Sequence, residues 1–256
     1  MSAELSSVVA VVRTWNNTRI RQQVGNLLSF LPHVIVLVNK PKDGETTKTL
    51  LSDLQGEARL DIIELDTGEY FWALPLNAGM DRINALNASR QKAGQSSFEF
   101  VFPCSVEANF EKEDVEKMID CFADPEIGAV GTTFRGIQSG SEVPLTSYSY
   151  SHPRNTGMLI RLSVLKNSMV RNFDAICDSF GGMEDVDFVN RMLAFTEYRI
   201  KMLDLGVKLA IGVNWSQPEK EQREQEVIRN IAELRRTQAE RWQEAWRQLG
   251  IPVDTL

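Results

Sequence analysis

The sequence lacks the features that mark secreted, membrane-spanning and disulfide-rich proteins. It contains three cysteines, Cys104, Cys121 and Cys177, whose spacing matches no metal site and whose odd number leaves one unpaired. The N-terminal segment has no basic start, and its apolar run is too short for an export signal or a membrane span. We therefore expect a protein of a reducing compartment, the cytoplasm, with no membrane span.

An excess of positive charge is also missing. The formal net charge is -7, from 28 Lys and Arg against 35 Asp and Glu. Binding to nucleic acid depends on clustered basic residues, so this balance disfavours a nucleic-acid partner, while local basic sites for one small anion remain compatible with it. The 256 residues and the hydrophobic fraction of 43% suffice for one large globular domain with a substantial core.

The first half of the chain alternates between strand-like and helix-like patterns. Short β-branched or aromatic runs predict strands, and apolar residues at helical spacing predict the helices between them. The strands are expected at residues 8–12, 34–38, 60–65, 98–102 and 127–134, and the helices at 18–31, 46–55, 78–93 and 111–122. Such alternation predicts an α/β fold with a mostly parallel sheet and helices on both faces. Ligands of such sheets bind beyond the carboxyl ends of the strands.

The second half is less regular. Residues 135–154 are rich in Ser, Gly, Tyr and Pro and predict a long surface loop or an irregular hairpin, and residues 207–215 predict a last strand. Residues 218–249 show helical spacing of apolar residues and predict a long amphipathic helix. We therefore expect a main domain at 1–216 and a helical extension at 217–256, which packs on the domain or, alternatively, forms a dimer face or a membrane-surface contact.

The stretch "GGMEDVDFVNR", residues 181–191, carries the strongest chemical signal. It places Glu184, Asp185 and Asp187 where a helix is expected to begin. Acidic residues there can simply complement the helix dipole. Three carboxylates held close together also gain basicity, which suits a general base that takes a proton from a hydroxyl. A divalent cation is a further alternative, although the spacing does not match a calcium loop.

The order of several segments resembles a known family. The segments are "VVRTWNN", "VLVNKPKDGE", "PLNAGMDRINALN", "VFPCSVEANFEKEDVEKM", "RNTGMLIRLSVL" and "GGMEDVDFVNR". Over residues 6–215 this ordered set resembles the inverting glycosyltransferases of family two, which have the GT-A fold. The resemblance implies a GT-A domain that transfers a sugar from a nucleotide-diphosphate donor, with a UDP-sugar favoured, to an acceptor hydroxyl with inversion.

The resemblance also implies roles for individual residues on the acceptor side. Asp185 would stand at the position of the family's catalytic base, with Glu184 beside it in the catalytic group. Asp187, Arg154 and Asn155 would lie near the acceptor. The acceptor itself stays open between a glycan, a lipid-linked sugar, a small molecule, a protein and a modified nucleic-acid base, of which the acidic charge balance disfavours the last.

On the donor side the resemblance places Thr14 and Trp15 against the nucleobase. Asn39 would stand where the family usually carries an Asp that reads the base, and Asn77 and Gly79 resemble the family's N-x-G before the third helix. A diphosphate leaving group also needs positive charge. The candidates for that charge are Arg13, Lys40, Lys42 and Arg82.

The family's DxD metal motif would fall on Ser105 and Glu107, after the strand at 98–102. Glu107 keeps an oxygen ligand suited to Mg²⁺ or Mn²⁺, while Ser105 replaces the first carboxylate and no His follows the last strand. This depletion leaves a second hypothesis, a degenerate GT-A domain that binds a nucleotide or glycan without turnover. A nucleotidyltransferase is a third and weaker alternative, because "VVRTWNN" contains no glycine.

Overall fold

The computed structural model describes residues 4–14, 16–66, 73–138, 141–143, 156–173, 184–210 and 247. Trp15, Arg154 and Asn155 lie outside this range, as does the side chain of Lys42. The helix and extension predicted at 217–256 also lie outside it, apart from Arg247, and so stay predictions.

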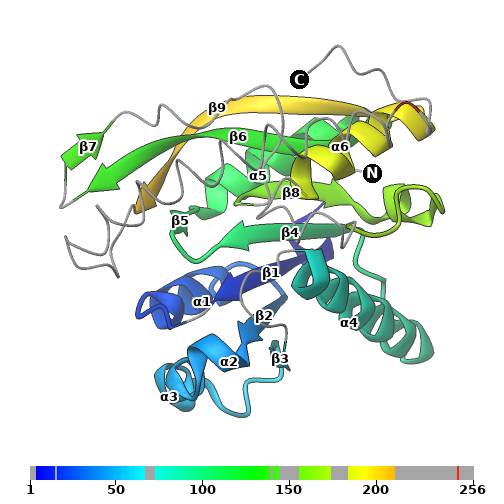
Figure 1. Cartoon of the computed structure of the whole chain (residues 1–256). Helices are drawn as coiled ribbons and strands as arrows, with labels where there is room; N and C mark the ends of the chain where they lie inside the picture. The colour runs from blue at the N-terminus through cyan, green and yellow to red at the C-terminus, as the bar shows by residue number, and fades with distance from the viewer. Residues whose placement is uncertain are drawn as a thin grey trace.

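A nine-stranded sheet forms the centre of the molecule, in the order β3-β2-β1-β4-β8-β6-β9-β5, with β7 paired to β6 (Figure 1). The strands are β1 (Val8–Thr14), β2 (His33–Asn39), β3 (Leu60–Leu65), β4 (Phe100–Ser105), β5 (Ala108–Asn109), β6 (Ile127–Gln138), β7 (Ser141–Val143), β8 (Met158–Arg161) and β9 (Arg199–Ala210). Neighbours among β1 to β4 pair in parallel, as do β6 and β9. This arrangement confirms the predicted α/β class.

The helices cover both faces of the sheet, with α1 on one side and α4 on the other in Figure 1. They are α1 (Ile20–Leu28), α2 (Lys40–Asp43), α3 (Thr46–Leu50), α4 (Ala73–Lys92), α5 (Lys112–Asp120) and α6 (Glu184–Phe195). Short 3₁₀ turns are η1 (Leu5–Ser7), η2 (Ser52–Leu54), η3 (Cys121–Ala123) and η4 (Leu162–Lys166). The structure thus splits the helix expected at 46–55 into α3 and η2.

The residues of β1 explain why both faces are covered. Val8, Ala10 and Val12 pack with apolar residues of α1 and α5, whereas Val9 and Val11 pack with those of α4 and α6. All five side chains are completely buried. Because successive side chains of a strand point to opposite faces, a continuous apolar run is the pattern of a strand buried on both sides.

Three strands of the sheet, β5, β7 and β8, run against the strands with which they pair. β8 pairs antiparallel with both β4 and β6, and β6 continues past its predicted end at 134 into an antiparallel pairing with β7. The β6–β7 pairing confirms the hairpin alternative for the start of the 135–154 stretch. β9 begins eight residues before the predicted strand at 207–215, and its last described residue is Ala210.

Within the residues that the structure describes, no helix is both long and apolar enough to cross a membrane.

Candidate functional site

Several predicted donor-site residues end neighbouring strands at one edge of the sheet. Thr14 is the last residue of β1, Asn39 of β2 and Ser105 of β4. The register pairs Arg13 with Ser105 and Thr14 with Val38, so the three strand ends lie level with one another. This is the carboxyl edge of the parallel strands, where ligands of such sheets bind.

Thr14 and Asn39 are both buried at this edge. The Thr14 hydroxyl has no hydrogen-bond partner among the residues that the structure describes. A buried hydroxyl without a partner costs free energy, and a ligand that bonds to it removes that cost. The end of β1 is therefore suited to a polar ligand.

The loop after β1 is fixed by a residue that the sequence analysis did not single out. The buried carboxylate of Asp43 accepts hydrogen bonds from the Asn16 backbone N–H, from the Thr47 hydroxyl and, at 2.8 Å, from the Thr47 backbone N–H. Asn16 itself has a φ of 46°, a left-handed conformation that Asn tolerates better than most residues. Asp43 thus joins the loop after β1 to the start of α3.

Ser105 and Glu107 contact each other in the turn between β4 and β5. The Ser105 hydroxyl donates to Glu107 Oε2, and Asn17 Nδ2 donates to Glu107 Oε1 over 3.0 Å. Asn17 is buried, and it is not among the site residues predicted from the sequence. Glu107 therefore joins the turn after β4 to the loop after β1.

The side chains around Glu107 do not fit a resident Mg²⁺ or Mn²⁺ ion. These ions need several oxygen ligands, of which proteins commonly supply one or two carboxylates. Here the described neighbours of Glu107 add no second carboxylate, because Asn17 presents its amide nitrogen and Ser105 its hydroxyl proton. Among the described residues, no three His, Cys, Asp or Glu side chains are placed to share an ion. The metal predicted at Glu107 finds no support in the groups that surround it.

An ion pair brings the acidic turn to the same edge of the sheet. Arg13 Nη1 lies 3.5 Å from Glu184 Oε1, and the two side chains are only 10% and 4% exposed. Glu184 is the first residue of α6, and Asp185 follows it, also buried. The acidic start of α6 is therefore anchored beside the end of β1, as the predicted site requires.

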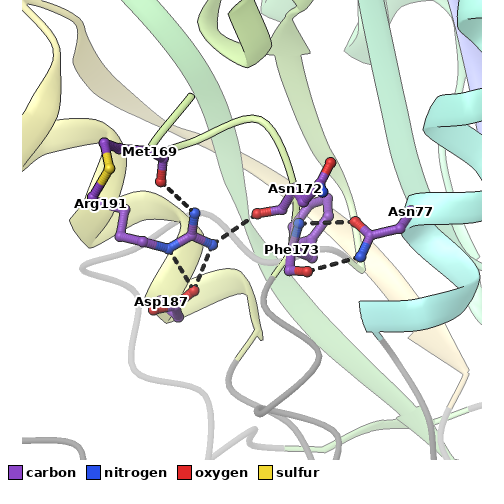
Figure 2. A network of polar contacts seen from close by, with 6 residues as sticks. All are labelled: Asn77, Met169, Asn172, Phe173, Asp187 and Arg191. Atoms are coloured by element: carbon purple, nitrogen blue, oxygen red, sulfur yellow. Dashed lines mark hydrogen bonds and ion pairs between the residues drawn. The ribbon is translucent and has the colours of Figure 1, made fainter. Parts of the chain in front are cut away.

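The third acidic residue of the turn has a different partner. Asp187 accepts two hydrogen bonds from Arg191, one helical turn later, and Arg191 also donates to the carbonyl oxygens of Met169 and Asn172 at 2.7 and 2.8 Å (Figure 2). The predicted acceptor contact of Asp187 thus competes with a bond that it already makes inside the protein.

Asn77 belongs to the same network. Its Nδ2 donates to the Phe173 carbonyl over 2.8 Å and its Oδ1 accepts from the Phe173 N–H over 2.9 Å (Figure 2). Asn77 lies inside α4, which begins at Ala73, and not before it. The amide predicted to bind the donor therefore holds the backbone of Phe173.

Gly79 has a packing role in α4. A Cβ at Gly79 would lie 2.9 Å from Val11 Cγ1, so this glycine allows α4 to pack closely on β1.

Arg82 lies at the opposite edge of the sheet. Its guanidinium donates to both carboxylate oxygens of Asp61 over 2.9 Å, and His33 Nε2 lies 2.7 Å from Asp61 Oδ2. His33 is the first residue of β2 and Asp61 the second of β3, so this cluster marks the amino ends of the strands. The structure does not bring Arg82 to the predicted donor site.

The remaining cation candidates are divided. Lys40 Nζ lies 3.1 Å from Glu64 Oε2, and Glu64 also pairs with Lys48, so Lys40 has an acidic partner on β3. Arg13 is the candidate that the structure places beside Ser105, through the register of β1 with β4.

A groove of about 700 Å³ lies between α4 and the segment after β8. None of the predicted site residues lines it.

Comparison with solved structures identifies the fold. Two crystal structures of S. aureus TarS 1-349 match this chain with a TM-score of 0.55 each, at 14% and 16% sequence identity. The matches cover 90% and 91% of this chain but 71% and 65% of the TarS chains. The second TarS structure is a complex with UDP-GlcNAc. No protein-family model and no curated protein sequence matches the chain.

TarS is a family-two-like glycosyltransferase with the GT-A fold. The chain described here has that fold, which confirms the fold implied by the resemblance in its sequence. At these identities the likeness reaches the fold and no further.

Proposed function

We propose that this protein transfers a sugar from a nucleotide-diphosphate donor to an acceptor hydroxyl. The observation that carries the proposal is the buried Arg13–Glu184 ion pair, which anchors the acidic start of α6 beside the strand ends of the predicted donor site. Sugar transfer needs the bound donor and the base that deprotonates the acceptor to lie close enough for the acceptor oxygen to reach the donor sugar. A GT-A fold shared with a glycosyltransferase supports this assignment.

The donor side is assigned to the ends of β1, β2 and β4. Thr14, whose hydroxyl has no partner among the described residues, and Asn39 would contact the nucleoside. Trp15, which lies outside the described residues, would pack on the base. A uridine diphosphate sugar is favoured because a structure with the same fold holds UDP-GlcNAc. Arg13, which the register of β1 with β4 pairs with Ser105, would face the leaving diphosphate.

The acceptor side is assigned to the start of α6. A carboxylate oxygen of Asp185 accepts the proton of the acceptor hydroxyl, and the hydroxyl oxygen attacks the anomeric carbon of the donor sugar. The bond from that carbon to the diphosphate oxygen breaks, and the nucleoside diphosphate leaves with the electron pair. Attack from the face opposite the leaving group inverts the anomeric centre. The Arg13–Glu184 pair holds Asp185 in place for this step.

The replacement Asp185→Asn tests the base. It keeps the size of the side chain but removes its basicity, so we expect sugar transfer to fall by about 10²–10⁴-fold. Donor binding should stay close to that of the wild type, because Asp185 contacts the acceptor. The assay measures UDP release from a panel of UDP-sugars with a panel of hydroxyl acceptors, and Glu113→Gln, on the exposed side of α5, is the control. Unchanged turnover in the Asp185→Asn variant would contradict the assignment.

A second candidate function is nucleotide or glycan binding without turnover. The observation that favours it is the hydrogen bond from the Ser105 hydroxyl to Glu107, at the position where the resemblance would place a carboxylate. A raised melting temperature with UDP-sugars, combined with no UDP release under any acceptor condition, would support this alternative. Turnover with any donor and acceptor pair would exclude it.

A further inference from the structure

The hydroxyl proton of Ser105 lies between the Ser105 oxygen and the carboxylate of Glu107. The Ser105 hydroxyl donates to Glu107 Oε2, and the same hydroxyl oxygen accepts the Glu107 backbone N–H over 3.3 Å. A carboxylate in place of Ser105 would bring two negative charges into contact. Two carboxylates that share a site repel each other unless a cation or a proton lies between them. In this chain the hydroxyl proton already occupies that position.

The second oxygen of Glu107 is held by an amide whose orientation is fixed. Asn17 Oδ1 accepts the Arg19 backbone N–H over 3.0 Å, so the other end of the amide, Nδ2, faces Glu107. Asn17 is 4% exposed, and its carbonyl accepts the Ile20 N–H over 3.1 Å at the start of α1. Asn17 therefore cannot turn its oxygen toward an ion at Glu107 without losing its partly buried hydrogen bond to Arg19.

The backbone around the pair is tied to three other segments. Ser105 N–H donates to the Thr156 carbonyl over 2.9 Å, and the Glu107 carbonyl accepts the Ala210 N–H over 3.0 Å. Gln23, on α1, donates to the Ala108 carbonyl over 2.9 Å. Two backbone bonds and one side-chain bond thus hold the turn after β4 in place, and none of them involves an ion.

We infer that Asn17 is a positioning residue for Glu107 and that donor binding by this chain does not depend on a divalent cation. The Ser105 hydroxyl and the Asn17 amide donate hydrogen bonds to the two oxygens of Glu107, so no second carboxylate lies against Glu107 to require a metal ion. The inference rests on the proposed function for its substrate, a nucleoside diphosphate or its sugar. It assigns Ser105 and Asn17 a shared role at the edge of the predicted donor site.

Calorimetric titration of the full chain with UDP tests the inference directly. We expect the dissociation constants for UDP in EDTA and in excess Mn²⁺ to agree within about twofold. For comparison, a tenfold change in the dissociation constant corresponds to about 1.4 kcal/mol of binding free energy. Weakening by about tenfold or more in EDTA would overturn the inference.

The variant Ser105→Asp is the matched gain-of-metal control. It places a second carboxylate against Glu107, so we expect EDTA to lower its melting temperature and Mn²⁺ to restore it, while the wild type shows no shift with either. Ser105→Ala separates the two effects, because it removes the hydroxyl without adding charge and should show no response to Mn²⁺. A wild-type response to Mn²⁺ equal to that of Ser105→Asp would contradict the inference.

A direct measurement of Mn²⁺ binding by electron paramagnetic resonance keeps the test independent of the donor. We expect the wild type without nucleotide to leave the Mn²⁺ signal free and Ser105→Asp to bind the ion. If Ser105→Asp fails to fold, the wild-type titration alone decides, and Mn²⁺ bound tightly by the wild type overturns the inference. No UDP binding under any condition would contradict the proposed function, while the wild-type Mn²⁺ result would still decide whether this site holds a metal.

Discussion

Both hydrogen bonds from Arg191 to Asp187 end on a single carboxylate oxygen, Oδ2, at 2.8 and 2.6 Å. The two side chains are 9% and 7% exposed, and the guanidinium also donates to the carbonyl of Met169 through Nη1 and to that of Asn172 through Nη2. Arg191 therefore fixes the first turn of α6 to the segment that Asn77 holds from α4 (Figure 2). The pair fixes Asp187 in the first turn of α6, two residues after Asp185.

Replacement of Arg191 by Ala should destabilise the protein strongly. It leaves the Asp187 carboxylate buried without its charged partner, which typically costs about 3–5 kcal/mol. Urea unfolding measures the loss. Arg199→Ala is the matched control, because Arg199 pairs with Asp124 and Glu126 at 2.8 and 2.9 Å on the exposed surface. Its removal should cost less than about 1 kcal/mol. Equal losses in the two variants would contradict the role given to Arg191.

A methyl group at Gly157 should also be costly. The added Cβ would overlap the Phe110 ring, which is completely buried and packed edge-on against Phe102 at 4.9 Å between ring centroids. Overpacking of this kind typically costs about 1–3 kcal/mol. We expect Gly157→Ala to unfold at lower urea concentration than the wild type.

Gly25→Ala serves as the control for Gly157→Ala. Gly25 lies inside α1, and its added Cβ meets only the end of the Arg21 side chain, at 2.7 Å from Nη1. That side chain is half-exposed and can move aside. Because Ala favours helix over Gly by about 1 kcal/mol, Gly25→Ala should be neutral or stabilising. A loss as large as that of Gly157→Ala would show that packing at Phe110 is not the cause.

Cys104 should resist thiol reagents in the folded protein. Burial raises the pKa of its thiol to about 12, although Gln23 and Arg13 act in the opposite direction. At pH 8 almost no thiolate is present, and the side chain is completely buried. Titration with a disulfide reagent should therefore modify Cys104 only as the protein unfolds. The variant Cys104→Ala identifies its signal, and rapid modification under native conditions would contradict the expectation.

The Asp61 cluster should make stability depend on pH. Burial alone would raise the pKa of Asp61, but hydrogen bonds from Arg82 and His33 prevail and hold it below its ordinary value. A carboxyl group with a lowered folded-state pKa stabilises the protein above the unfolded value of about 3.9, and this contribution is lost as pH falls through the folded-state pKa.

The variant Asp61→Asn tests this dependence. The wild type should exceed it in unfolding free energy at pH 7, and the difference should shrink as the pH is lowered below about 4. Asp81→Asn, at an exposed position on α4, is the control and should show a smaller change. A difference between the wild type and Asp61→Asn that stays constant down to low pH would contradict the expectation.

The sequence predicted the elements whose patterns are local. β1 to β4 are short β-branched or aromatic runs, and α1 and α5 show clear helical spacing, so both types of element were identified near their observed bounds. The antiparallel direction of β8 was not predicted, because strand direction depends on pairing with β4 and β6, which lie far away in the sequence.

The position of Arg82 also could not be predicted from the sequence. α4 begins at Ala73 at the carboxyl edge and runs against the strands, so nine residues at 1.5 Å each carry Arg82 about 13 Å toward the other edge. The sequence had placed the start of this helix at 78, which left Arg82 in its first turns. By contrast, the Asp187–Arg191 spacing of four residues is a recognisable pattern for a helical ion pair and was overlooked.

The antiparallel strand β8 has a consequence for how the protein is made. β1 to β4 end at residue 105, but β8, which covers the free edge of β4, begins at Met158. A chain emerging from the ribosome therefore exposes that edge while residues 106–157 are synthesised. Unpaired strand edges are templates for pairing between chains. We expect the edge of β4 to be the place where nascent copies of this protein aggregate when synthesis is fast or chaperones are scarce.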